Sequence, residues 1–128
     1  MKAKSLKSLE AAIFGAMQSV FEKKAIDPVV LDVRELTALT DYFLITSGET
    51  PAHIRALANV VEAELQSLGW KPQTVEGRQE GRWVLLDYGE LIVHIFRDRE
   101  RRFYNLEQFW HKAKVIKPEN WAQNRVSR

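Results

Sequence analysis

Apolar residues recur at helical spacing near the start of the chain. Between residues 5 and 24 they stand three or four positions apart, at Leu6, Leu9, Ile13, Ala16 and Val20. This spacing predicts an amphipathic helix with one buried stripe. We expect Asp27-Pro28 to end the helix, because a proline pushes the residue before it out of the helical region.

Two strands are expected next. Residues 29–35 alternate, with Val29, Leu31 and Val33 on one face, which is typical of a half-buried strand. Residues 42–47, YFLITS, form a nearly continuous apolar run of β-forming residues, so they predict a more central strand.

The clearest helix start follows in TSGETP. Thr50 can cap the helix, and Pro51 suits its first position, where a missing N–H costs nothing. Gly69 is expected to end the helix, because glycine readily adopts the left-handed conformation found there. One apolar face runs between these points: Ile54, Leu57, Ala58, Val61, Leu65 and Leu68.

The rest of the chain predicts an edge strand at 71–77 and a hairpin of strands at about 82–87 and 90–96, joined by a tight turn at Tyr88-Gly89. Phe103, Leu106 and Trp110 then have the spacing of helical turns. The element order predicts an α/β (α+β) fold, in which a mixed β-sheet of about five strands is flanked by helices. We expect one folded domain over residues 1–111 and a basic tail over 112–128.

Composition agrees with an ordinary globular domain. The chain has 128 residues, 45% hydrophobic and 28% charged, and it has no cysteine. Disulfides, thiolate metal sites and a cysteine nucleophile are therefore excluded. No apolar run approaches the roughly 20 residues of a membrane helix, and no signal peptide is recognisable at the start. We expect a cytoplasmic protein with no membrane contact.

The net charge of +2 hides an asymmetry along the chain. Residues 9–96 hold seven Lys/Arg against thirteen Asp/Glu, a balance of −6, whereas residues 112–128 hold five against one, a balance of +4. An acidic body does not suit a surface that reads nucleic acid, but it can attract a basic protein. The basic tail is expected to be solvated, with peripheral phosphate contact as a second interpretation.

Catalytic patterns are weak. His94 lies within an apolar strand, so a buried histidine with one hydrogen bond is favoured over a catalytic base. His53 could cap the second helix, meet a partner or be exposed. TSGETP resembles a phosphate loop only in outline, because it lacks the GxxxxGK[ST] and GxGxxG patterns. Asp32 and Asp87 each lack a second carboxylate two residues away, which disfavours a magnesium site, and we expect neither cofactor nor metal.

Trp83 and the charged run at residues 97–102 each allow two interpretations. Trp83 opens a strand and could be either a binding hot spot or a core-edge residue. The run RDRERR at 97–102 is typical of a solvated turn, with Arg101 or Arg102 as an anchor for strand-end carboxylates as the alternative.

Three segments, LTDYFLITSG, VEGRQEGRWVLLDYGELIVHIF and RRFYNLEQFW, resemble the Iojap family of ribosomal silencing factors in order and spacing. The resemblance covers about residues 8–111. It implies a nucleotidyltransferase-like fold without the catalytic acids. It also implies a non-enzymatic function, in which the protein binds the large ribosomal subunit at its protein L-fourteen, blocks joining of the small subunit and represses translation when nutrients are scarce. Members are often dimeric when isolated, so the resemblance allows a homodimer of the free protein.

The family motifs fall on Thr40-Asp41-Tyr42, Glu76-Gly77, Trp83, Asp87-Tyr88-Gly89 and His94, and on Arg102 and Tyr104. Many relatives have an arginine before the histidine of the second helix, where this chain has Ala52. We expect acidic groups beside an aromatic anchor to contact a basic ribosomal protein. The candidate partner-binding residues are Asp41, Tyr42, Glu76, Glu80, Trp83, Asp87, Tyr88, Arg102 and Tyr104.

Two other functions remain open at this point. A small nucleotide-binding or nucleotidyltransferase-type enzyme is the main alternative, motivated by TSGETP and by the fold that the resemblance implies. A general RNA-binding protein rests only on the pI of about 9.0 and the basic tail, which could also make a peripheral contact with ribosomal RNA.

Overall fold

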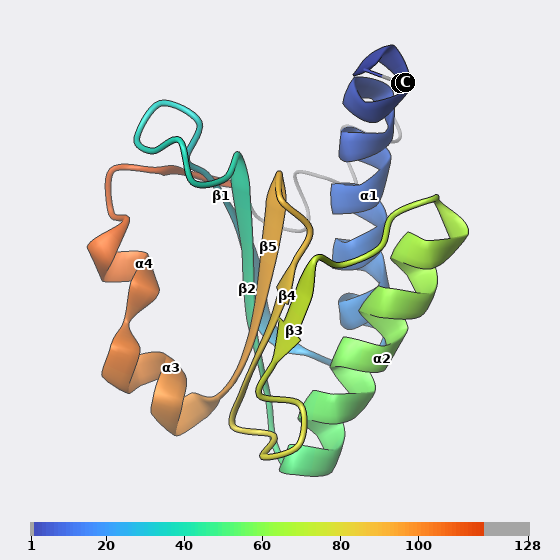
Figure 1. The fold of residues 1–128 in the computed structure, drawn as a ribbon. Coiled ribbons are helices and arrows are strands. Elements are labelled where there is room, and N and C mark those ends of the chain that lie inside the picture. The colour runs from blue at the N-terminus through green and yellow to red at the C-terminus, as the bar shows by residue number, and fades with distance from the viewer. Residues whose placement is uncertain (1, 117–128) are drawn as a thin grey trace.

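One six-stranded mixed sheet organises the chain (Figure 1). The structure is a computed structural model that describes the backbone of residues 2–116 and the side chains of residues 9–116. Its elements in chain order are α1 (Lys2–Glu22), β1 (Ile26–Asp32), β2 (Tyr42–Gly48), α2 (Pro51–Ser67), β3 (Thr74–Glu76), β4 (Trp83–Asp87), β5 (Leu91–Arg97), α3 (Asp98–Tyr104), α4 (Leu106–Phe109) and β6 (Lys114–Ile116).

The sheet has the strand order β3-β4-β5-β2-β1-β6. Its central pair, β2 and β5, is parallel, and all the other pairs are antiparallel. The predicted fold class, a mixed sheet flanked by helices, is therefore confirmed, with six strands in place of about five. None of the described helices combines the length and apolar content that a membrane crossing requires.

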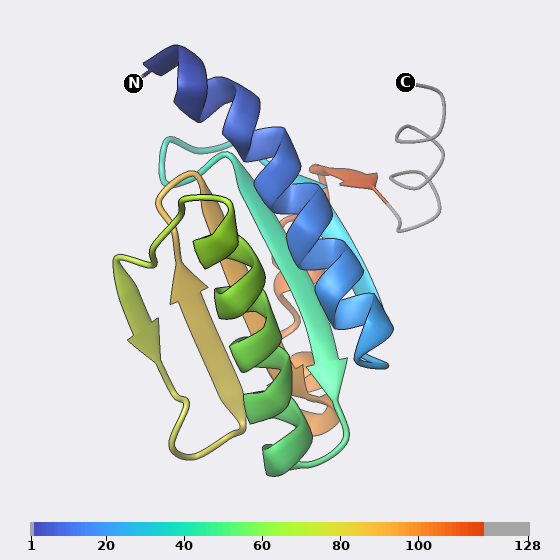
Figure 2. The same cartoon turned by 90° about the vertical axis from the view of Figure 1, so that its right-hand side faces the viewer.

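The two faces of the sheet carry separate cores. Helices α1 and α2 pack side by side on one face, which we call the inner face (Figure 2). The short helices α3 and α4 lie on the opposite, outer face (Figure 1). Strand side chains alternate, so Leu44 belongs to the inner core while its neighbours Phe43 and Ile45 belong to the outer core.

Helix α2 begins where the sequence predicts. The Thr50 side chain accepts a hydrogen bond from the His53 backbone N–H at 3.0 Å, and Pro51 occupies the first turn. The helix ends at Ser67, and Gly69 beyond it has the left-handed φ of 92°. The predicted apolar face is buried against the sheet and α1.

The expected end of α1 at Asp27-Pro28 is wrong. The helix ends at Glu22, and Lys24 turns the chain with a left-handed φ of 65°. Asp27 and Pro28 lie inside β1, where the register with β2 shifts between Ile26 and Val29. Proline has no N–H to give to a strand ladder, so a bulge is a place that tolerates it.

Strand β6 extends the sheet into the segment expected to be a basic tail. Residues 114–116 pair with β1, with Val30 opposite Ile116 and Asp32 opposite Lys114, and Ala113 is buried. The sheet thus continues past the boundary expected at residue 111. The remainder of that segment, residues 117–128 with Trp121, lies outside the described residues.

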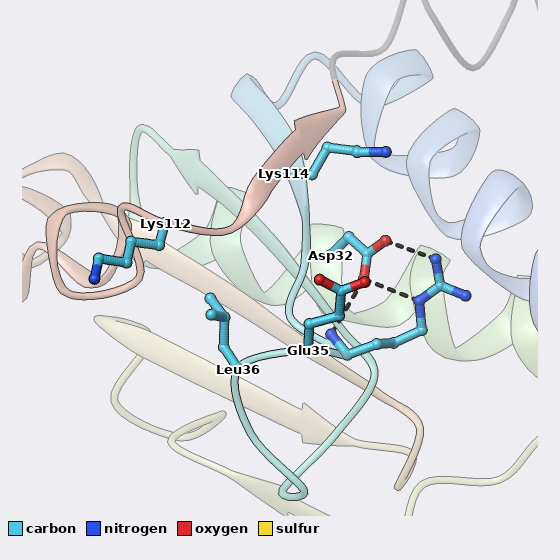
Figure 3. Close-up of a pocket in the computed structure, with 6 residues that line it drawn as sticks. Asp32, Glu35, Leu36, Lys112 and Lys114 are labelled. Atoms are coloured by element: carbon cyan, nitrogen blue, oxygen red, sulfur yellow. Dashed lines mark hydrogen bonds and ion pairs between the residues drawn. The ribbon is translucent and has the colours of Figure 1, made fainter.

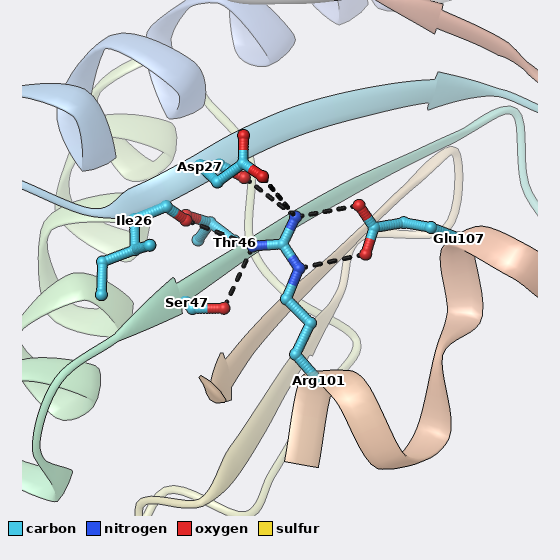
Figure 4. A network of polar contacts seen from close by, with 6 residues as sticks. All are labelled: Ile26, Asp27, Thr46, Ser47, Arg101 and Glu107. Atoms are coloured by element: carbon cyan, nitrogen blue, oxygen red, sulfur yellow. Dashed lines mark hydrogen bonds and ion pairs between the residues drawn. The ribbon is translucent and has the colours of Figure 1, made fainter. Parts of the chain in front are cut away.

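A buried guanidinium fixes the outer helices to the sheet (Figure 4). Arg101 of α3 donates hydrogen bonds to the backbone oxygens of Ile26 (3.2 Å) and Asp27 (2.9 Å) and to the Ser47 hydroxyl (3.0 Å). It also binds both carboxylate oxygens of Glu107 on α4, each at 3.0 Å. The anchor interpretation of RDRERR therefore applies to Arg101, although its acceptors are mostly backbone and hydroxyl oxygens.

Arg102 behaves differently from Arg101. Its side chain is 75% exposed, and its ion pair with Asp98 on the same helix lies at the surface. The two adjacent arginines thus provide a matched pair, one buried and one solvated.

We expect Arg101→Lys to lower the free energy of unfolding by roughly 2 kcal/mol or more, because lysine keeps the charge but cannot reproduce the planar fork of charged hydrogen bonds. Arg102→Lys should change it by less than about 0.5 kcal/mol. Urea denaturation of both variants measures the difference. Equal losses would contradict the anchoring role of Arg101.

The β4–β5 hairpin closes through a tight turn between Tyr88 and Leu91. The Tyr88 N–H donates to the Leu91 carbonyl at 2.8 Å, and the Gly89 N–H donates to the Asp87 carboxylate at 2.8 Å. Gly89 has a φ of 87°. The turn is thus centred on Gly89-Glu90, one residue beyond the predicted position.

Gly89→Val should destabilise the domain by roughly 1–3 kcal/mol, because a β-branched residue is strained at this positive φ. Gly89→Asn should cost less, since asparagine tolerates the left-handed region better. Thermal melting of the two variants tests this. A valine variant with the same melting temperature as the parent would show that position 89 is not strained by a side chain.

Candidate partner-binding face

Candidate residues from β3 and β4 come together on the outer face. The strand register places Glu76 opposite Leu85, and Asp87 between Thr74 and Ile92. Cross-strand neighbours share a face, so two carboxylates flank a half-buried Leu85. Trp83 stands two residues before Leu85 on the same face. We call Glu76, Trp83, Leu85 and Asp87 the strand patch.

Trp83 is both a packing residue and a surface residue. Its indole N–H donates to His94 Nδ1 at 3.1 Å, and its ring lies 4.8 Å from Phe96 and 4.7 Å from Tyr104, measured between centroids. The side chain remains half-buried rather than enclosed. The packing confirms the core-edge interpretation, and the partial exposure leaves the binding hot spot as a prediction. Any substitution of Trp83 affects the core as well as the surface.

His94 forms the floor beneath Trp83. It is 5% exposed, its Nδ1 accepts the bond from Trp83, and its buried Nε2 has no hydrogen-bond partner among the described residues. The predicted buried histidine with one hydrogen bond is confirmed. Burial lowers the pKa of His94 to about 4, because the surrounding apolar and aromatic side chains solvate the imidazolium poorly.

Three other candidates lie outside the strand patch, on α3 and in the loop before β4. Tyr104 of α3 adjoins the strand patch by packing against Trp83, with the two rings tilted by 46°. Arg102 is exposed on α3, and Glu80 is exposed in the loop that leads to Trp83. None of these three is buried, so all are accessible to a partner.

Tyr42 and Tyr88 do not belong to the outer face. Tyr42 packs against the inner core, with the Arg34 guanidinium 5.2 Å from its ring centroid, and burial raises its pKa. Tyr88 is 4% exposed within the inner core, and burial raises its pKa to about 12. The expected partner contact of Tyr88 is corrected, because its ring presents almost no surface. Asp41 precedes β2, and its backbone N–H donates to the Glu90 carbonyl.

Asp32 lies in a separate polar pocket of about 530 Å³ (Figure 3). Arg34 binds both of its carboxylate oxygens, at 3.0 and 2.7 Å, and this hydrogen bonding lowers the pKa of Asp32. Glu35, Leu36, Lys112 and Lys114 complete the lining. Within residues 9–116 the structure brings together no group of three or more histidine, aspartate or glutamate side chains that could hold a metal ion.

The turn from β2 into α2, which resembles a phosphate loop in outline, is already occupied by side chains. His53 Nδ1 accepts from the Glu49 N–H at 3.0 Å, and its Nε2 lies 2.9 Å from the Lys23 carbonyl. His53 therefore links the start of α2 to the end of α1. Thr50 caps a further N–H of the first turn. Sequence reasoning did not foresee this link, since Lys23 and His53 are thirty positions apart.

The burial of His94 predicts a pH dependence of stability. An unfolded histidine takes up its proton near pH 6.5, whereas the folded group does so near pH 4. Between these values the unfolded chain binds more protons than the folded one. The contribution of His94 to the free energy of unfolding is therefore fully present above pH 6.5 and is lost as the pH drops toward 4. The loss should be roughly 1 kcal/mol by pH 5.5 and roughly 3 kcal/mol in full.

Urea denaturation at pH 7 and pH 5.5 measures this loss before most carboxylates titrate. His94→Gln should show a clearly smaller difference between the two pH values, whatever its stability at pH 7. A difference as large as that of the parent would assign the pH dependence to other groups.

Comparison with known proteins identifies the family of this chain. A family model described as "Ribosomal silencing factor during starvation" matches residues 6–128. Ribosomal silencing factor RsfS of Halalkalibacterium halodurans is 35% identical over 104 residues, which are 81% of this chain and 89% of that protein. A mouse protein named mitochondrial assembly of ribosomal large subunit protein 1 is 27% identical over 70% of this chain and 40% of its own length.

A solved structure of a Chromobacterium violaceum protein has the same fold. It superposes with a TM-score of 0.77 at 30% sequence identity, covering 79% of this chain and 84% of that one. The family expected from the three sequence segments is thereby confirmed. The chain belongs to the family of ribosomal silencing factors.

Proposed function

We propose that this protein binds the large ribosomal subunit through a basic ribosomal protein of the L-fourteen type and thereby blocks joining of the small subunit. Translation is repressed in this way when nutrients are scarce, and no chemical reaction is catalysed. Membership of the ribosomal silencing factor family carries the proposal. The name of the mouse relative, which refers to the ribosomal large subunit, supports the choice of subunit.

The strand patch is a suitable contact for a basic protein. Leu85 and Trp83 supply apolar and aromatic area at its centre, and such residues contribute most of the energy of an interface. Glu76 and Asp87 flank that centre, where carboxylates attract lysine and arginine during approach and fix the register. Asp41 and Tyr42 form a separate candidate contact at the start of β2.

Blocking of subunit joining requires only occupancy. A factor that holds the joining surface of one subunit lowers the apparent affinity of the other by the factor 1 + [L]/Kd, where L is the free factor. A surface on paired strands suits such a function, because its backbone is already ordered before binding. A homodimer of the free protein and ribosomal RNA contact by residues 112–128 remain further predictions.

Sedimentation of purified subunits tests the proposal. The protein should migrate with large subunits, and the fraction of joined ribosomes should fall as its concentration rises. Migration with small subunits alone, or an unchanged fraction of joined ribosomes at saturating protein, would refute it.

A charge reversal tests the strand patch. Glu76→Lys should weaken large-subunit binding by about tenfold, or about 1.4 kcal/mol, because an exposed attractive charge becomes a repulsive one. Glu10→Lys makes the same change in net charge on α1, which covers the inner face, and should leave binding nearly unchanged. Equal effects of the two substitutions would show that only net charge matters.

A further inference from the structure

Three aromatic side chains stand exposed on the short outer helices. Phe103 and Tyr104 of α3 are 78% and 48% exposed, and Phe109 of α4 is 71% exposed. Exposed aromatic rings are costly in water, so several of them on two consecutive helices indicate a binding surface. We call these three residues, together with Arg99 and Arg102, the α3–α4 surface.

Each exposed phenylalanine contacts a ring that in turn contacts an aromatic residue of the outer core. Phe103 meets Tyr104 edge-on at 5.0 Å, and Tyr104 lies 4.7 Å from Trp83. Phe109 meets Trp110 edge-on at 5.1 Å, and Trp110 lies 5.5 Å from Phe43. These edge-on contacts restrict both phenylalanine rings before binding, which reduces the entropy lost when a flat ligand stacks on them.

The charge of this segment is opposite to that of the preceding chain. Residues 97–112 hold five Lys/Arg against three Asp/Glu, a balance of +2, whereas residues 9–96 have a balance of −6. Arg101 and Glu107 neutralise each other internally. Both side chains of the Arg102–Asp98 pair are exposed, so Arg102 can leave Asp98 and bind a phosphate at little cost in free energy. Arg99 is exposed and forms no ion pair within the described part of the chain.

The kind of exposed side chain indicates the partner. On α3 and α4 the large exposed apolar residues are all aromatic. Within residues 9–116 the large exposed aliphatic residues lie elsewhere, on β1, on β6 and in the loop between β1 and β2: Ile26, Val115, Leu36 and Leu39. Aromatic faces beside arginine form a surface on which unpaired bases stack while phosphates meet the cations. Aromatic rings also occur in protein interfaces, so the positive charge of this segment, with Arg99 and Arg102 beside the rings, is what favours RNA as the partner.

We propose that the α3–α4 surface binds single-stranded RNA. Phe103 and Phe109 stack with unpaired bases, and Arg99 and Arg102 contact phosphates. The RNA would be ribosomal RNA that is exposed beside the basic protein contacted by the strand patch. Only this source of the RNA rests on the proposed function. Tyr104, which packs against Trp83, lies at the junction of the two surfaces.

Fluorescence anisotropy with a labelled oligouridine of about 12 nucleotides, a length within the usual site sizes, tests RNA binding by the full chain at about 50 mM salt. Phe103→Ala and Phe109→Ala should each weaken binding about tenfold. Phe21→Ala removes a ring that is 61% exposed on α1, behind the opposite face of the sheet, and should leave binding unchanged. Arg99→Gln should reduce the slope of log affinity against log salt by roughly 0.7, the value for one phosphate contact with a single strand.

The outcomes separate this inference from the proposed function. No RNA binding by the parent, or equal binding by the parent and both phenylalanine variants, overturns the α3–α4 surface. Large-subunit sedimentation of the same proteins reports on the proposed function independently. If the parent binds RNA but not the large subunit, the RNA surface stands and the proposed function fails. Circular dichroism of each variant confirms that the fold is retained, and the salt slope of Arg99→Gln tests the surface without removing a ring.

Discussion

The outer face of the sheet depends on the hydrogen bonds of one buried guanidinium. Helices α3 and α4 have seven and four residues, too few to be stable in water by themselves. Arg101 fixes both, because its fork binds Glu107 of α4 and reaches the carbonyls of Ile26 and Asp27. Those carbonyls are presented where β1 departs from regular pairing around Pro28. The irregular part of β1 thus binds Arg101, and Arg101 holds the two helices that carry the exposed aromatic rings.

The elements that the sequence predicted well are those whose signals are local. Thr50-Pro51 and Gly69 marked both ends of α2, and the alternation around Gly89 marked the hairpin to within one residue. The missed features depend on contacts between distant residues. Strand β6 has only three residues, too few for a periodic pattern, and it forms because β1 offers an open edge. Arg101 looked like its neighbours in RDRERR, and only the fold distinguishes the buried arginine from the exposed ones.

The candidate site was predicted in part for the same reason. Resemblance to the family selected Glu76, Trp83 and Asp87, and the strand register then placed them on one face. The same reasoning included Tyr42 and Tyr88, whose rings turn to the inner core. Alternation along a strand states which neighbours share a face, but it does not state which face meets the helices. That choice is made by α1 and α2, which bury the inner side.

The division of charge across the outer side has a consequence for orientation in the proposed complex. The strand patch carries Glu76 and Asp87, whereas the α3–α4 surface carries Arg99 and Arg102. A ribosomal surface on which a basic protein lies next to RNA carries the opposite charges, positive on the protein and negative on the RNA. In the correct orientation both contacts are attractive, and in the reversed one carboxylates face phosphates while arginines face lysines. Because like charges in contact are costly and screening at physiological salt acts over about 8 Å, the proposed complex would disfavour the reversed orientation as well as favour the correct one.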